Sequence, residues 1–130
     1  MRTLEQEFAE KVYEKVDEFG RDHPKNTKQT ERNQYGSMAH KLPVLIRTAG
    51  LAEALAFVES RGKDAHKKLL DDLAFVISEN SRDDLLKKSR KDGLQEYMYL
   101  TRRTMLALKW FKRFAQSVLE VDATAEGGTS

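Results

Sequence analysis

The chain has 130 residues, of which 39% are hydrophobic, and its formal net charge is +2. That length suits one domain with a single core, and the absence of cysteine excludes disulfides, a thiolate nucleophile and thiolate metal ligands. The apolar runs are much shorter than a membrane span, and the sequence after Met1 is charged and amphipathic, so we expect neither a membrane segment nor a signal peptide. We therefore expect a soluble, cytoplasmic protein.

Charge is segregated along the chain. Residues 21–68 contain ten Lys or Arg against five Asp or Glu, and residues 85–115 contain nine against two. The three remaining segments are each acidic. Two interpretations stay open: the basic segments are ordinary solvated helix surfaces, or they form basic faces for a polyanionic partner.

The first 30 residues predict one helix and one loop. Thr3 and Gln6 have the spacing of a capping box, and Gly20 is a stop signal. Between them, apolar residues recur at helical spacing: Leu4, Phe8, Val12, Val16 and Phe19. Residues 21–30 are polar and contain Pro24, so we expect them to form a loop.

A second helix is predicted from about residue 30 to Ala49. Its core face repeats at three and four residues: Tyr35, Met38, Leu42, Leu45 and Ala49. The opposite face carries two cations, one histidine, a glycine and a proline: Arg32, Gly36, His40, Pro43 and Arg47. We expect Pro43 to bend the helix.

Four more helices complete the predicted fold. Gly50 and Gly62 delimit a helix over 51–60, and the next runs over about 64–79. Ser81, with Asp84 three residues on, caps a short helix, and Gly93 starts a long last one. The fold class is all-α, a compact single-domain helical bundle of five or six helices over residues 1–121, followed by a polar tail over 122–130.

The last helix carries three stripes. The core stripe consists of Tyr97, Thr101, Met105, Leu108, Phe111, Ala115 and Val118. Opposite it, Arg102, Lys109 and Arg113 form a cationic row. Between the two lie Tyr99, Arg103, Leu106 and Trp110. This third stripe predicts either a helix buried over more than half its circumference or a partner surface beside a phosphate-facing edge.

No catalytic, metal or cofactor site is predicted. Two pairs of adjacent carboxylates point about 100° apart on a helix, so we interpret them as solvated caps: Asp71 with Asp72, and Asp83 with Asp84. His66 beside lysines is a poor metal ligand. His40 is a candidate general base on an RNA 2′-hydroxyl, but local spacing fixes no second acid or base near it.

Two segments resemble a known family. The run from Tyr35 to Leu51, YGSMAHKLPVLIRTAGL, is followed by ALAF at 54–57, and WFKRFA covers 110–115. Together they resemble the small subunit of the type III-B CRISPR effector, the Cmr complex. The similarity spans about residues 3–121. One departure is Ala49, where that family often has Asn before Gly-Leu.

The resemblance implies a non-enzymatic helical bundle that is present in several copies in a ribonucleoprotein of antiviral defence. Related small subunits stack end to end beside the backbone subunits that hold the guide. They line the channel in which guide RNA pairs with target RNA. The partners implied are therefore guide RNA, target RNA, other effector subunits and head-to-tail copies of the chain, with no membrane and no cofactor.

Candidate site residues follow from the stripes and from this resemblance. The expected RNA-backbone contacts are Arg32, Lys41, Arg47, Arg102, Lys109 and Arg113. The expected protein interface is Tyr99, Leu106 and Trp110. Two alternatives remain: a helical adaptor without RNA contact, and a free-standing nucleic-acid binder. Against the second, no short helix pair has a polar, base-reading second helix.

Overall fold

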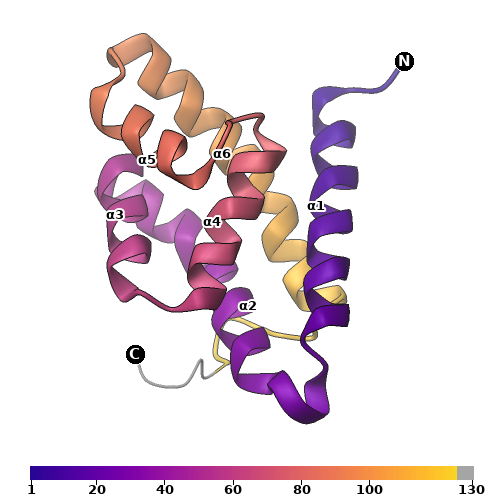
Figure 1. The fold of residues 1–130 in the computed structure, drawn as a ribbon. Helices are drawn as coiled ribbons and strands as arrows, with labels where there is room; N and C mark the ends of the chain where they lie inside the picture. The colour runs from indigo at the N-terminus through magenta and orange to yellow at the C-terminus, as the bar shows by residue number, and fades with distance from the viewer. Residues whose placement is uncertain (126–130) are drawn as a thin grey trace.

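The computed structural model describes residues 1–125, and it confirms an all-α fold with no strand in that part of the chain. The helices are α1 (Leu4–Asp22), α2 (Lys25–Ala49), α3 (Leu51–Arg61), α4 (Asp64–Val76), α5 (Arg82–Lys91) and α6 (Leu94–Ser117). Figure 1 shows α1 at one edge of the bundle, α3 and α5 at the opposite edge, and α4 between them. The long helix α6 packs against both α1 and α2.

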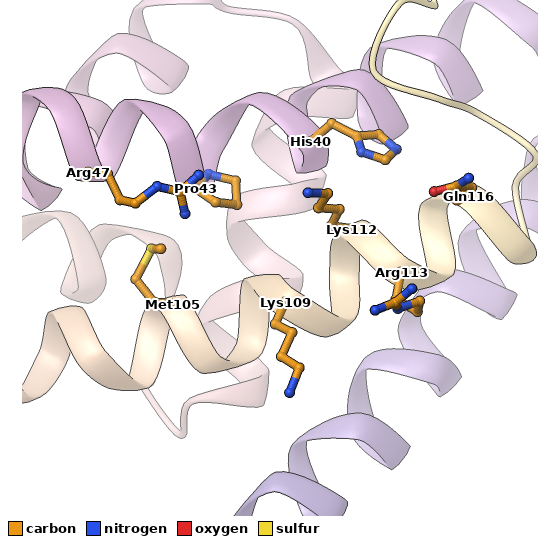
Figure 2. A pocket seen from close by; sticks show the side chains of 8 residues that line it. All are labelled: His40, Pro43, Arg47, Met105, Lys109, Lys112, Arg113 and Gln116. Carbon is orange, nitrogen blue, oxygen red and sulfur yellow. The ribbon is translucent and has the colours of Figure 1, made fainter.

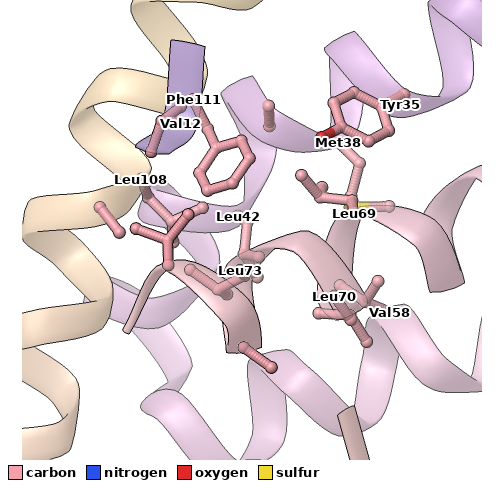
Figure 3. Close-up of a cluster of buried hydrophobic side chains, with 14 of the residues drawn as sticks. Val12, Tyr35, Met38, Leu42, Val58, Leu69, Leu70, Leu73, Leu108 and Phe111 are labelled. Carbon is pink, nitrogen blue, oxygen red and sulfur yellow. The ribbon is translucent and has the colours of Figure 1, made fainter. Parts of the chain in front are cut away.

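The core lies where α2, α4 and α6 meet. Leu42 from α2, Leu73 from α4 and Phe111 from α6 are each fully buried, and Val12 of α1 closes one side (Figure 3). The predicted core faces of α3 and α4 are confirmed, because every residue assigned to them is buried: Leu51, Ala54, Leu55, Val58, Leu69, Leu70, Leu73, Val76 and Ile77. The caps predicted at Thr3 and Ser81 are also present.

The loop predicted over residues 21–30 is wrong. α1 continues to Asp22, and α2 begins at Lys25, so only His23 and Pro24 link them. Pro24 is the N-cap of α2, where its fixed φ of −64° suits the start of a helix. The residues after it are exposed, so this first part of α2 forms without any apolar pattern to signal it. Lys28 is non-helical, with φ −131°, which marks a kink there.

The segment that follows α6 packs back across α2. Residues 119–121, which we call the C-terminal strap, follow α6. They cover part of the α2 face opposite the predicted core face, at Arg32, Gly36 and His40. A Cβ on Gly36 would lie 2.6 Å from the Cβ of Val121, so only glycine allows the strap this close. His40 donates from Nε2 to the Val121 carbonyl at 3.0 Å.

Arg32 lies beneath the strap and is only 5% exposed. Its Nη1 donates to the carbonyls of Gly20 (2.9 Å) and His23 (3.0 Å), and its Nη2 donates to that of Leu119 (3.0 Å). The position of Arg32 argues against the expected contact with RNA, because the residue is buried and its Nη1 and Nη2 are committed to three backbone carbonyls. Helical periodicity places Arg32 on the polar side of α2, but it does not reveal that the strap covers that side.

The buried face of α6 is shifted around the helix from the predicted one. Leu108, Phe111 and Ala115 are fully buried as expected, whereas four residues of the predicted stripe are only half-buried: Tyr97, Thr101, Met105 and Val118. Three other α6 residues are buried: Leu100, Thr104 and Ala107. This follows because α1, α2, α4 and α5 all pack on α6. In α2, the end of the predicted core face is also less buried, since Leu45 is half-buried and Ala49 is exposed.

The interpretation of Asp72 as a solvated cap is wrong. Asp72 is 1% exposed and accepts hydrogen bonds from the Tyr35 hydroxyl (2.7 Å) and from Lys68 Nζ (3.0 Å). Burial raises the pKa of its carboxyl, while the bond from Tyr35 and the charge of Lys68 act in the opposite direction. Asp71, one residue before it, is exposed and pairs with Arg82. Through its bonds to Tyr35 of α2 and Lys68 of α4, Asp72 therefore links α2 to α4.

The predicted tail over 122–130 is only partly described. Asp122 accepts from the backbone N–H and the hydroxyl of Thr124, which forms a turn, and residues 126–130 lie outside the described part. No residue after Val121 enters a helix within the described range.

Leu108→Ala should lower the free energy of unfolding by about 2 to 5 kcal/mol, because Leu108 is fully buried and truncation leaves a cavity. Urea unfolding followed by circular dichroism measures this loss. Leu94→Ala on the same helix is the control, since Leu94 is 74% exposed and should change stability by less than about 0.5 kcal/mol. Equal effects in the two variants would contradict the assigned core.

Gly36→Ala should destabilise the protein by about 1 to 3 kcal/mol, because the added methyl overlaps Val121. The same methyl in an open helix interior stabilises it, so the sign of the change reports on the strap. Combining Gly36→Ala with Val121→Gly should remove the overlap, and the two changes together should cost less than the sum of the single losses. Additive losses in thermal unfolding would show that the strap does not pack on Gly36.

Candidate nucleic-acid interface

A basic groove runs between α2 and α6. It encloses about 290 Å³, and its lining consists of His40, Pro43, Arg47, Met105, Lys109, Lys112, Arg113 and Gln116 (Figure 2). Four of these side chains are cations, and none is a carboxylate. The groove is therefore a site of concentrated positive charge on a chain whose net charge is only +2.

Helical spacing explains how each wall forms. On α2, Pro43 and Arg47 are four residues apart and so share one face, while on α6 the spacing from Met105 to Lys109 and from Lys112 to Gln116 is also four. The sequence predicts a bend at Pro43, but α2 stays helical through that residue. The residue inside α2 with non-helical backbone angles is Lys28. The strap holds α6 and α2 together at the His40 end through the bond from His40 to Val121.

The cations of the groove differ in how far they are neutralised. Lys109 pairs with Glu5 of α1, and its Nζ also lies 5.4 Å from the centre of the Trp110 ring. Within residues 1–125, Arg47, Lys112 and Arg113 have no hydrogen-bonded or ion-pair partner, and all three are exposed. Figure 2 shows Lys112 extending from α6 towards α2. These three side chains therefore remain available to an anion.

The structure brings together part of the predicted RNA-binding set. Arg47, Lys109 and Arg113 line the groove, as their opposite-face positions suggested. Arg102 is exposed on α6 but outside the lining. Lys41 is exposed elsewhere on α2, where its charge acts on His66. RNA contact by all of the predicted residues remains a prediction, and burial beneath the strap argues against it for Arg32.

Lys112 and Gln116 are groove residues that the sequence analysis missed. Lys112 comes directly after the buried Phe111, so it falls outside the cationic row defined by Arg102, Lys109 and Arg113. The available signal was its position three residues after Lys109 and four before Gln116. That spacing alone does not tell which neighbouring helix the side chain faces.

His40 lies at the strap end of the groove and is 7% exposed. The carbonyl of Val121 can only accept a hydrogen bond, so Nε2 of His40 carries a proton and donates it. Nδ1 is buried and has no partner in the described part of the chain. Nε2 is committed to the strap, and the lining holds no carboxylate that could assist a catalytic base, which argues against the general-base role considered for His40. Among residues 1–125 there is no group of side chains that could hold a metal ion.

The residues of the third stripe of α6 differ in how far they are buried. The ring centres of Trp110 and Phe114 lie 5.7 Å apart in a stacked arrangement, and those of Phe114 and Tyr13 of α1 lie 5.4 Å apart in a T-shaped one. Trp110 and Leu106 are half-buried against the core, whereas Tyr99 is 55% exposed beneath the Arg103 guanidinium. Of the three predicted interface residues, Tyr99 is thus the one with most of its surface free.

Comparison with known proteins identifies the family. Residues 4–118 match the family model described as CRISPR-associated protein (Cas_Cmr5). The chain belongs to the Cmr5 family. It is 48% identical over 120 residues to the CRISPR system Cmr subunit Cmr5 of Thermus thermophilus, and the match covers 92% of this chain and 99% of that relative.

A solved structure agrees with the family assignment. The crystal structure of a CRISPR-associated Cmr5 family protein from Thermus thermophilus superposes with a TM-score of 0.79 at 46% identity. The match covers 90% of this chain and 98% of that one. Among the described residues of the chain, no helix is both long and apolar enough to cross a bilayer.

His66, the other histidine weighed as a functional residue, is buried. It is 3% exposed, and its Nδ1 has no partner in the described residues. Burial, together with the charges of Arg61, Lys41 and Lys63, lowers the pKa of His66 to about 4. The ring is therefore neutral at physiological pH, and nothing in its described surroundings supplies a metal ligand set.

The lowered pKa of His66 should make stability depend on pH. The unfolded chain binds a proton near the ordinary value of 6.5, and the folded chain only near 4, so unfolding takes up a proton between these values. Stability contributed by neutral His66, up to about 3 kcal/mol, is therefore present above pH 6.5 and lost as the pH falls towards 4. His66→Gln should flatten this part of the profile in urea unfolding at several pH values.

His23→Gln is the matched control, because it makes the same substitution at a histidine that is only half-buried, at the end of α1. It should keep the loss of stability below pH 6.5. The difference between each variant and the parent chain removes contributions from groups common to both, including Asp72. If the loss of stability below pH 6.5 persisted undiminished in His66→Gln, His66 would not be the group responsible.

Proposed function

We propose that this chain is a non-catalytic structural subunit of a type III-B Cmr complex and that its α2–α6 groove contacts RNA backbone. The observation that carries the proposal is the groove itself: four cations and no carboxylate line one concave surface. A relative covering nearly the whole chain is named as a Cmr subunit. Cationic side chains in such a groove match the phosphates of guide and target RNA.

Backbone contact is sufficient for such a subunit. In an RNA-guided complex, base pairing between guide and target reads the sequence, so a protein lining the channel needs only to recognise phosphates and the shape of the strand. Arg47, Lys112 and Arg113 suit that role because each is exposed and none has a partner within the described residues. The enclosed ring of His40 supports a non-catalytic role.

Several copies would bind RNA better than one. A single chain presents few free cations, and physiological salt weakens such contacts steeply. Copies stacked head to tail along the backbone subunits hold their grooves at high effective concentration near the same RNA. Head-to-tail stacking does not close on itself, so the other subunits must set the number of copies.

The interface between copies, or with a neighbouring subunit, is proposed to include the start of α6. Tyr99 is 55% exposed, and Leu94 and Met98 on the same part of the helix are 74% and 48% exposed. Exposed apolar side chains close together favour protein contact. Leu106 and Trp110 would extend this interface only through the parts of their surfaces that the core leaves free.

One observation favours the alternative, an adaptor without RNA contact. Lys109 pairs with Glu5, so part of the basic surface serves the fold by joining α6 to α1. A free-standing nucleic-acid binder is less well supported, because the basic side chains of the groove lie in a concavity rather than on a projecting helix.

Reversing two free cations of the groove, Arg47→Glu with Arg113→Glu, should weaken target-RNA capture by the assembled complex. The effect should be largest at low salt, because each lost phosphate contact makes the slope of log K against log salt shallower by about 0.7 to 0.9. The fold should persist, since exposed charges contribute little to stability. Filter binding over a salt series, with circular dichroism of the isolated chain, measures both.

The control has the same change in charge: Lys87→Glu with Lys91→Glu, two exposed positions on α5 outside the groove. It should leave capture and its salt slope nearly unchanged. If the groove variant assembles normally and captures target with unaltered affinity at every salt concentration, the groove does not face RNA, and the adaptor role replaces this proposal.

A further inference from the structure

We propose that a second pocket, between α5 and the start of α6, binds a lysine or arginine side chain of a neighbouring protein subunit. This inference rests on the proposed function, which assigns the start of α6 to a subunit interface, and it deepens that function by naming the chemistry of the partner. It does not depend on the α2–α6 groove. It follows from a buried carboxylate, from the pairing of the charges in the pocket and from the apolar surface at its edge.

The pocket lies where the end of α5 meets the start of α6. It encloses about 210 Å³, which is below the usual range for small-molecule sites and suits a single side chain. Glu96, Tyr99 and Arg103 line it from α6, where spacings of three and four residues place them on one face. Figure 1 shows the start of α6 beside α5 at one end of the bundle. The pocket is therefore open to a neighbouring molecule.

Glu79 contributes a carboxylate that is almost enclosed. Its side chain is only 7% exposed, and its Oε1 lies 2.7 Å from Lys88 Nζ. Its other oxygen has no partner within the described residues. The preceding turn fixes its position, because Ser78 has a φ of 66° and Arg103 donates to the carbonyl of Ile77. A buried carboxylate is costly unless its oxygens are paired, so the open oxygen favours a further cationic donor.

The other charges of the pocket also favour a cation. The side chains of Asp92 and Glu96 form no ion pair or hydrogen bond within residues 1–125. Lys88 is already paired with Glu79, and Arg103 is held by a backbone carbonyl and a tyrosine ring. The bond from Lys88 to Glu79, with a smaller contribution from the charge of Asp92, raises the pKa of Lys88. An arriving cation therefore meets two free carboxylates, whereas an arriving anion meets cations that are already committed.

Apolar surface beside the pocket indicates that this cation belongs to a protein. Tyr99 at the edge of the pocket is exposed, as are Leu94 and Met98 earlier on α6. A lysine or arginine side chain has an aliphatic stem that packs on such surface while its charged end reaches the carboxylates. Methionine adapts its shape to a partner. No group of side chains within residues 1–125 could hold a metal ion, so an organic cation is the better match.

The test is a competition for places in the assembled complex. The parent chain and the pocket variant, Asp92→Asn with Glu96→Gln, carry different isotope labels and are mixed in equal amounts with the other subunits and guide RNA. Mass spectrometry of the purified complex gives the incorporated ratio, and circular dichroism checks the fold of the variant. The parent should be favoured by roughly 5- to 30-fold at low salt, the effect of two partly exposed ion pairs.

The control is Glu7→Gln with Glu14→Gln, which removes the same charge at exposed positions of α1 outside the pocket. Both variants make the chain more basic, so a general attraction to RNA affects them alike. The control should be incorporated as well as the parent.

The dependence on salt separates charge from packing. The advantage of the parent over the pocket variant should shrink as salt is raised, because salt screens partly exposed ion pairs. Tyr99→Ala, which removes apolar surface, should be disfavoured by a factor that changes little with salt.

The outcomes separate this inference from the proposed function. Equal incorporation of the parent and the pocket variant at every salt concentration would overturn the inference, and so would an equal loss in the control or a loss independent of salt. RNA contact by the groove is judged separately, by target capture with the Arg47→Glu, Arg113→Glu variant. If the parent chain itself does not join the other Cmr subunits, the proposed function and this inference both fail.

Discussion

The buried guanidinium of Arg32 connects three parts of the chain that would otherwise be free to separate. It donates to carbonyls at the end of α1, in the two-residue link and in the C-terminal strap. A buried cation is costly unless its donors are paired, and hydrogen bonds to charged groups are stronger than neutral ones. Arg32 therefore fixes both the corner between α1 and α2 and the return of the chain after α6.

The groove depends on that return. After α6 the backbone turns through Glu120, whose φ of 59° is unusual for a residue other than glycine. The turn is held by the bond from the Val121 N–H to the Ala115 carbonyl and by the pairing of Glu120 with Lys25. It places Val121 over Gly36, and so α6 lies along α2 (Figure 1). Basic side chains of both helices then line one groove.

Helical periodicity and capping signals predicted those features of the fold that depend on residues close together in the sequence. The helix over 51–60 and its core face, the caps at Thr3 and Ser81 and the start at Gly93 all follow from residues within one turn of each other, and the structure confirms them. The mistakes have a different origin. Arg32, His40 and Asp72 each find partners 87, 81 and 37 residues away, and a helical wheel treats each as solvent-facing.

The groove was predictable only in part for the same reason. Arg47 and Arg113 were identified because each lies opposite a core face of its own helix, but nothing in either helix fixes how the two pack together. Lys112 joined them only through the contact between α2 and α6. The charge pattern, by contrast, was informative from the start, since both basic segments of the sequence contribute to this one surface.

The most direct test of the account is to locate RNA on this subunit within the assembled complex. Target RNA substituted with 4-thiouridine can be cross-linked by light, and mass spectrometry of the digested complex identifies the peptides that carry the cross-link. The account predicts cross-links to peptides from 40–47 of α2 and 105–116 of α6. Cross-links from this subunit that fall only on the basic segment 87–91 of α5, or on no part of it, would contradict the account.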